Sequence, residues 1–356
     1  MATDVTRSVR ADCLEVLEGR ASQLSDLRGA HLAVTGGTGF MGSWIAELVC
    51  ALNHEYGFGV ELTLVARRAR TFRERHPHIA RESFVRLVDA DVRDVFTFAE
   101  GTNVVVHAAG SPDNRSHATD PIGTMSAIGL GTHVVLEAAE RLRDLNSLLL
   151  VSSGLVYGAQ PEGLERIPET FVGGPAFDSV ASAYAEAKRF AESLGYAHRV
   201  QTKLPVVFAR PFAFIGPYQG LDKPWAVNNF LRDALLGGPI RILGDPGTRR
   251  SYLYPSDMAF WLLRIACAGT PGDAYNVGSD EAVQLGELAE LIARVQGGVD
   301  VTRRPGGFRN ASDFVPDVTK AALQLGLRRT VDLSSAVERT LESHRADFRA
   351  GAVAGT

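Results

Sequence analysis

Short apolar runs alternate with longer amphipathic stretches between residues 31 and 210, after an N-terminal stretch with helical periodicity. The runs are rich in Val, Leu and Ala, which is typical of β-strands buried on both faces. We predict strands at 31–35, 62–66, 84–89, 104–107, 148–152 and 205–209, with helices at 41–52, 122–142 and 183–200. This alternation predicts an α/β fold with a doubly wound parallel sheet.

The texture of the chain changes near residue 210, where Gly and Pro become frequent and strand signals become sparse. We therefore expect three parts. Residues 1–28 form a helical extension, residues 29–210 form the sheet domain with part of 255–285 returning to it, and residues 211–254 and 286–350 form a smaller mixed α/β lobe. Ligands of doubly wound folds bind beyond the carboxyl ends of the strands, so we expect the substrate between this lobe and the sheet.

The composition excludes several classes of protein. The chain has 356 residues, 45% of them hydrophobic and 22% charged, and a net charge of −4, so the overall field does not favour nucleic acid. Its three cysteines lie far apart, which predicts neither a disulfide framework nor a structural metal site. We find no apolar signal core and expect no apolar run long enough to cross a membrane, which predicts a cytoplasmic protein.

A glycine-rich turn follows the first predicted strand and opens the first predicted helix. Its spacing is Gly36-x-x-Gly39-x-x-Gly42. Gly36 permits the tight turn, Gly39 allows the backbone to approach a pyrophosphate, and Gly42 allows close packing of helix and strand. Phe40 and Met41 then lie at the helix N-terminus that faces the anion. This context predicts an NAD(P)-binding domain of the Rossmann type.

The ends of the second and third strands bear on which cofactor binds. Arg67 and Arg68 stand where an acidic residue would accept a hydrogen bond from the adenosine ribose. A guanidinium suits a 2′-phosphate instead, which favours NADP over NAD, although both arginines could simply be solvated. Asp91 and Val92 follow the third strand and are candidates for adenine contact, with a helix cap as the alternative for Asp91.

Three polar residues form the catalytic candidate. Tyr184 and Lys188 are one helical turn apart and share a helix face. Ser153 follows a predicted strand, at the edge of the sheet that faces the cofactor in this fold. A Tyr-x-x-x-Lys spacing alone is modest evidence, because it also arises by chance, so the assignment depends on the accompanying motifs.

Taken in order, these motifs resemble the extended short-chain dehydrogenases/reductases of the NAD(P)-dependent nucleotide-sugar epimerase/dehydratase family, over roughly residues 30–345. The matching segments are 36–42, 91–92, 106–109, Ser153 with 156–158, Tyr184 with Lys188, 210–211, 216–219, 250–257 and 275–278.

The resemblance implies roles for the candidate residues. Tyr184 would act as acid/base on a sugar hydroxyl, and Lys188 would favour its phenolate form and hold the nicotinamide ribose. Ser153 would bond to the reacting oxygen. His107 is expected to be a buried packing residue. The remaining implied contacts are those of Ala108 and Ala109 with the cofactor, and of Gly154 and Arg250 with the substrate.

The sequence departs from the family pattern at four positions. Sugar 4,6-dehydratases carry an Asp-Glu pair where this chain has Gly154 and Leu155, neither of which can move a proton. Ala213 and Ile128 stand where the family often has asparagine. The lost asparagine at 213 leaves room for an unusual sugar nucleotide or nucleoside substrate. The resemblance also implies a homodimer formed by the helices that carry Ile128 and Tyr184.

We therefore expect an enzyme that oxidises a sugar hydroxyl to a transient ketone and recycles the hydride on retained NADP or NAD. A nucleoside-diphosphate-sugar 4-epimerase is the leading interpretation. The alternatives are an NADPH-dependent 4-ketoreductase and a redox-assisted dehydratase of a nucleotide sugar or nucleoside with relocated acids. A non-catalytic sensor of the same fold would be expected to have lost Tyr184 or Lys188, which this chain retains.

Overall fold

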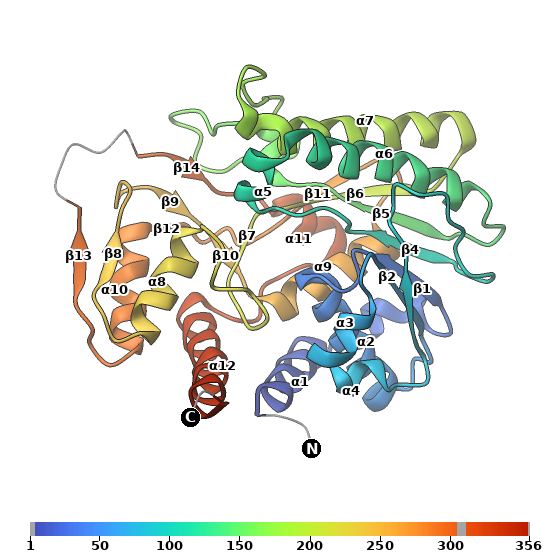
Figure 1. The fold of residues 1–356 in the computed structure, drawn as a ribbon. Coiled ribbons are helices and arrows are strands. Elements are labelled where there is room, and N and C mark those ends of the chain that lie inside the picture. The colour runs from blue at the N-terminus through green and yellow to red at the C-terminus, as the bar shows by residue number, and fades with distance from the viewer. Residues whose placement is uncertain (1–3, 305–310, 355–356) are drawn as a thin grey trace.

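The computed structural model describes residues 4–304 and 311–354. Its centre is a sheet of seven strands that all pair in parallel, in the order β11-β6-β5-β4-β1-β2-β3 (Figure 1). The strands are β1 (His31–Thr35), β2 (Glu61–Ala66), β3 (Val85–Asp89), β4 (Val104–His107), β5 (Ser147–Val151), β6 (Val206–Pro211) and β11 (Ala274–Val277). The predicted doubly wound parallel sheet is confirmed.

Helices cover both faces of the sheet (Figure 1). One face carries α5 (Asn114–Thr119), α6 (Pro121–Glu140) and α7 (Ala183–Thr202), and the other carries α2 (Phe40–Tyr56) and α9 (Pro255–Ala268). The short helices α3 (Arg70–Arg75) and α4 (Pro77–Ala80) connect β2 to β3. Near-continuous apolar strands are stable here because both sides of the sheet are buried.

The N-terminal residues form α1 (Asp4–Leu17) and the 3-10 helix η1 (Ala21–Leu27), and both pack against α9. Val9 and Cys13 are fully buried in this contact. Asp12 accepts hydrogen bonds from the Tyr254 hydroxyl at 2.6 Å and from Arg339 at 2.8 Å. Arg339 belongs to α12 (Leu333–Ala354), so the N-terminal helix is tied to the C-terminal one.

The length and composition of α6 correct one expectation from the sequence. This helix is long and apolar enough to cross a membrane by those criteria alone, whereas we expected no such segment. Half of its apolar window is buried, and the helix packs against α7 and β4. The buried half of the helix is therefore apolar because it lies in the core.

Residues after β6 build a second lobe, seen on the left of Figure 1. Its strands are β7 (Ala213–Phe214), β8 (Ile240–Ile242), β9 (Arg249–Arg250), β10 (Tyr252–Leu253), β12 (Val283–Gln284), β13 (Val301–Arg303) and β14 (Asp313–Phe314). Its helices are α8 (Ala226–Leu235) and α10 (Leu285–Val295), whereas α11 (Thr319–Leu325) packs against α9 and β11. The chain thus returns to the sheet through α9, β11 and α11.

Candidate active site

The glycine turn between β1 and α2 leaves no room for a side chain at Gly36 or at Gly42. Gly36 has a φ of +68°, and a Cβ there would lie 2.6 Å from the Ala108 carbonyl oxygen. A Cβ on Gly42 would lie 2.3 Å from the Gly37 oxygen. Gly39 is the residue before α2. The N–H groups of the first turn of α2, which begins at Phe40, have no partner within the helix. The turn therefore fits a dinucleotide pyrophosphate, which these amides and the helix dipole would hold.

The residues at the end of β4 lie beside the glycine turn. The Ala108 N–H donates to Thr35 O at 3.0 Å, which fixes Ala108 and the following Ala109 beside the glycine turn. The His107 ring is buried and hydrogen-bonded to the hydroxyls of Thr35 at 2.6 Å and Thr132 at 3.1 Å. Burial lowers the pKa of His107 to about 3, so the ring is neutral. It is a packing residue, as expected.

The candidate adenosine contacts lie at the ends of β2 and β3. Arg67 and Arg68 are exposed beyond β2. Asp91 is held by Arg93, which donates from Nε at 3.0 Å and from Nη2 at 2.7 Å and so lowers the pKa of Asp91 to about 2. Val92 is buried against Gly131 of α6. Contact of Asp91 and Val92 with adenine stays a prediction.

Ser153, Tyr184 and Lys188 meet just beyond the carboxyl end of β5. Ser153 caps the 3-10 helix η2 (Gly154–Tyr157) by accepting from the Leu155 N–H at 3.2 Å. Tyr184 stands in the first turn of α7 and hydrogen-bonds to Ser153. One turn later, Lys188 Nζ donates to the Val151 carbonyl oxygen at 2.7 Å. The structure thus brings the three catalytic candidates together.

Burial dominates the electrostatics of this group. Tyr184 is 6% exposed, and desolvation raises the pKa of its phenol to about 12, while the hydrogen bond with Ser153 acts in the opposite direction. Lys188 is 4% exposed, and desolvation lowers the pKa of its ammonium to about 8. We expected Lys188 to favour the phenolate. In this structure the loss of hydration outweighs that effect, because both charged forms are costly in a dry site.

The two departures beside Ser153 have different structural settings. A Cβ on Gly154 would lie 2.8 Å from the Phe212 ring, and that ring packs 4.8 Å from the Phe314 ring. A side chain at 154 would therefore displace a packed aromatic cluster. Leu155 is 42% exposed. Neither position offers a group that could move a proton.

Arg250 lies on β9 of the second lobe. Its Nη1 donates to the carbonyl oxygens of Arg249 and Ser312, both at 2.8 Å, and Nη2 donates to Ser312 Oγ at 3.3 Å. Desolvation lowers the pKa of this guanidinium. The neighbouring Asp313 pairs instead with Arg249. Because the hydrogen-bond partners of Arg250 are neutral, its charge remains available to an anionic ligand.

A buried polar network adjoins the site. The sequence alone assigns no role to its residues, although the segments that contain them match motifs of the family. The Tyr157 hydroxyl donates to Asn276 Oδ1 at 2.8 Å and accepts from Arg210 Nη1 at 2.9 Å. Arg210 also pairs with Glu192 of α7 at 2.6 Å. The network joins η2, β6, β11 and α7. It therefore fixes η2, which follows Ser153, and α7, whose first turn carries Tyr184. Polar residues at the ends of otherwise apolar strands were the available signal.

Two contacts of the site could not be read from the sequence. Ile128, which replaces a family asparagine, is buried in the same apolar cluster as Tyr184. The His117 ring of α5 stacks on the Tyr184 ring, with centroids 4.6 Å apart and an interplanar angle of 10°. No local pattern predicts either contact, because each joins segments that are distant in the chain.

Residues of metal-ligand type also gather at one place outside the Ser153, Tyr184 and Lys188 group. Glu47, His76 and His78 lie with their ligand atoms within 4.8 Å of one another. The Glu47 carboxylate accepts from His78 at 2.8 Å and from the Tyr218 hydroxyl at 2.6 Å. The His76 ring packs against those of Tyr218 and Phe72, each with a centroid separation of 4.6 Å. These contacts explain the cluster as packing of α2 against the second lobe.

Comparison with known proteins finds similar chains among enzymes that are named for reactions of nucleotide sugars. The chain is 26% identical over 331 residues to UDP-glucuronic acid decarboxylase 1 of Xenopus tropicalis, covering 91% of this chain and 74% of that protein. It is 28% identical over 331 residues to dTDP-glucose 4,6-dehydratase of Streptomyces niveus, covering 88% and 93% respectively.

The fold is shared with the UDP-glucuronic acid 4-epimerase of Bacillus cereus, whose crystal structure contains UDP-glucuronic acid and NAD. The TM-score is 0.74 at 20% identity, covering 88% of this chain and 98% of that one. The model of the NAD dependent epimerase/dehydratase family matches residues 32–278, which include the glycine turn, Ser153, Tyr184 and Lys188. The chain belongs to the NAD dependent epimerase/dehydratase family and is an enzyme of that family.

Proposed function

We propose that the chain is a nucleoside-diphosphate-sugar 4-epimerase that retains its nicotinamide cofactor through turnover. The observation that carries the proposal is the meeting of Ser153, Tyr184 and Lys188, with Gly154 and Leu155 where a dehydratase has its acid pair. Such a site can move a proton and a hydride at one carbon. The neighbouring residues at 154 and 155 supply no acid or base for elimination.

In this proposal Tyr184 takes the proton of the sugar 4-hydroxyl and later returns it. Ser153 donates a hydrogen bond to the same oxygen as it becomes a carbonyl. Lys188 holds the nicotinamide ribose and adds a positive charge near the phenol. The nicotinamide, when bound, supplies reversible acceptance of hydride. Epimerisation would then need a site in which the ketone can turn and present its opposite face.

The second lobe supports an anionic nucleotide substrate. Arg250 presents a partly buried guanidinium whose hydrogen-bond partners are neutral, which suits a diphosphate. Relatives of the chain are named for reactions of UDP-glucuronic acid and dTDP-glucose. We therefore propose a pyrimidine nucleoside diphosphate sugar as the substrate class, bound between Arg250 and Tyr184.

Tyr184→Phe tests the proposed role of the phenol. With UDP-glucose, UDP-glucuronic acid and dTDP-glucose as probes, we expect this variant to lower turnover by about 10²- to 10⁴-fold, because the proton acceptor is lost. Product analysis would measure the 4-epimer. Tyr56→Phe is the matched control, since Tyr56 is a half-buried tyrosine at the end of α2 and lies outside the catalytic group. Equal turnover of the Tyr184→Phe variant and wild type would refute the mechanism.

A 4-ketoreductase is the second candidate, and the exposed Arg67 and Arg68 favour it because they suit the 2′-phosphate of NADPH. The purified protein should be denatured and its released nicotinamide identified. The epimerase predicts about one nicotinamide per chain after dialysis, whereas a site that empties supports the reductase.

If NADP is the cofactor, replacing both Arg67 and Arg68 by Ser weakens NADP binding and leaves NAD binding unchanged. Equal effects on the two would contradict that role.

We further propose a homodimer formed through α6 and α7. These helices pack side by side on one face of the sheet (Figure 1) and carry large apolar side chains that are exposed. They are Ile122, Met125 and Leu130 on α6, and Phe190, Tyr196 and Val200 on α7. Exposed apolar side chains on two neighbouring helices suit a second copy of the same surface.

The pair of changes Leu130→Glu and Phe190→Glu tests this surface. Burial of two carboxylates in an apolar interface is costly, so we expect the double variant to have the mass of a monomer in light scattering. Leu323→Glu on α11 is the control, because Leu323 is also exposed and apolar but lies on another helix. A double variant that keeps the dimer mass would exclude this interface, as would a wild-type monomer.

A further inference from the structure

The catalytic candidate Tyr184 is covered by a second aromatic ring. His117 is 3% exposed, and its ring lies almost parallel to that of Tyr184, with centroids 4.6 Å apart. We propose that His117 is a positioning residue for Tyr184, and that its own placement depends on an ion-pair cluster joining residues 111–117 to the second lobe. The inference rests on the proposed role of Tyr184 as acid/base.

The His117 ring is fixed within its own segment. Its Nε2 lies 2.7 Å from the Ser111 carbonyl oxygen, and because a carbonyl only accepts, Nε2 is the donor. The His117 N–H donates to the Asp113 carbonyl oxygen at 3.2 Å. Ring and backbone are thus both held by residues 111–113. A ring held in this way restricts tilting of the phenol that it covers.

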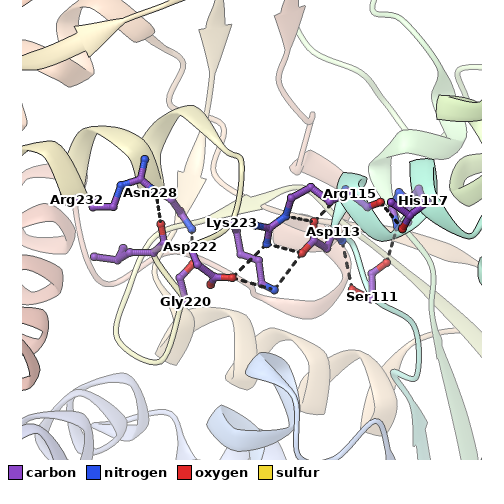
Figure 2. Close-up of polar contacts among 11 residues, drawn as sticks. Ser111, Asp113, Arg115, His117, Gly220, Asp222, Lys223, Asn228 and Arg232 are labelled. Carbon is purple, nitrogen blue, oxygen red and sulfur yellow. Dashed lines mark hydrogen bonds and ion pairs between the residues drawn. The ribbon is translucent and has the colours of Figure 1, made fainter. Parts of the chain in front are cut away.

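Four charged residues, here named the Asp113 cluster, hold this segment against the second lobe (Figure 2). Asp113 accepts from Arg115 Nη2 at 2.9 Å and from Lys223 Nζ at 3.0 Å. Arg115 also donates to Asp222 at 3.1 Å. Asp113 and Arg115 precede α6, whereas Asp222 and Lys223 lie in the loop before α8. The cluster therefore bridges the sheet domain and the second lobe.

The burial of Asp113 makes this bridge specific. Its side chain is 7% exposed, and the hydrogen bonds from Arg115 and Lys223 hold the pKa of Asp113 well below its usual range. A carboxylate buried to this extent is costly without cationic partners, so the segment is held where Lys223 can reach it. Pairs among exposed side chains alone would hold it weakly.

The loop that supplies Lys223 is itself anchored on α8. Asn228 donates from Nδ2 to the Gly220 carbonyl oxygen at 2.7 Å (Figure 2). It also accepts from Gln219 at 2.9 Å. Arg232 donates to the Leu221 carbonyl oxygen at 3.3 Å. A continuous set of contacts therefore leads from α8 through Lys223, Asp113 and His117 to the phenol. The placement of Tyr184 depends on the position of the lobe that receives the substrate.

The glycine after Ala109 places the same segment beside the catalytic ammonium. A Cβ on Gly110 would lie 3.5 Å from Lys188 Nζ. Residues 110–117 thus border both members of the Tyr184–Lys188 pair. A shift of this segment would disturb the phenol and the ammonium together.

The test uses the nicotinamide-loaded protein, with UDP-glucose, UDP-glucuronic acid and dTDP-glucose as probes. Single-turnover reduction of the bound nicotinamide is followed by absorbance for His117→Ala and His117→Phe, each also made in the Tyr184→Phe background. We expect His117→Ala to slow reduction by about tenfold at saturating probe, without a change in KM. His117→Phe should restore part of the rate, because a stacked ring remains although its hydrogen bond to Ser111 is lost. His54→Ala, at a half-exposed histidine of α2, is the control.

The double variant separates positioning from a merely structural role. If His117 acts through the phenol, His117→Ala has no further effect once Tyr184 is Phe. Lys223→Met should give a smaller loss with the same dependence on Tyr184. The proposal is overturned if His117→Ala reduces the nicotinamide at the wild-type rate while Tyr184→Phe does not. It is also overturned if the loss persists undiminished in the Tyr184→Phe background.

A second measurement needs no substrate and separates failure of this inference from failure of the proposed function. In protein labelled with ring-¹³C tyrosine, the Tyr184 signal is the one missing from Tyr184→Phe. We expect His117→Ala to remove the ring-current shift of that signal and His117→Phe to retain it. If no probe reduces the nicotinamide, the proposed function fails. The measurement still shows whether the His117 ring stacks on the Tyr184 ring. A Tyr184 signal unchanged by His117→Ala overturns the inference.

Discussion

Burial of a phenol and an ammonium group in one dry pocket is the constraint on which the proposed active site depends. Tyr184 and Lys188 are each almost wholly removed from water, and their pKa values shift to about 12 and about 8, both towards the uncharged form. A pair with these properties does not hold a phenolate on its own. In the proposed mechanism, proton transfer therefore depends on what would complete the pocket: a substrate hydroxyl, and the positive charge of an oxidised nicotinamide.

The fold meets this constraint by fixing the ends of several strands with buried polar contacts. Thr35, His107 and Thr132 tie β1, β4 and α6 together beside the glycine turn. The contacts among Tyr157, Arg210 and Asn276 join η2, β6 and β11 on the other side. Between these two networks lie the end of β5 and the first turn of α7. Rigid surroundings of this kind allow two unfavourably buried groups to stay within reach of each other.

The sheet and the glycine turn could be predicted because they depend on local pattern, and β1 and β4 match their predicted bounds residue for residue. The strand β11 was not predicted, since a four-residue segment containing Tyr275 and Asn276 gives little apolar signal. The stack of His117 on Tyr184 and the pKa direction of Tyr184 depend on packing between distant segments. No periodicity encodes such contacts, although the motif spacing did indicate that Ser153, Tyr184 and Lys188 lie together beyond the carboxyl end of β5.

The most direct test of this account is an ultraviolet difference titration of the Tyr184 phenol, taken as wild type minus Tyr184→Phe, with and without oxidised nicotinamide. Without the cofactor the pKa should lie near 12. With it bound, the account predicts a pKa lower by about 1–3 units, because a cation then lies beside the phenol. The same pKa in both states would contradict the central claim that cofactor and lysine together make this buried tyrosine a base.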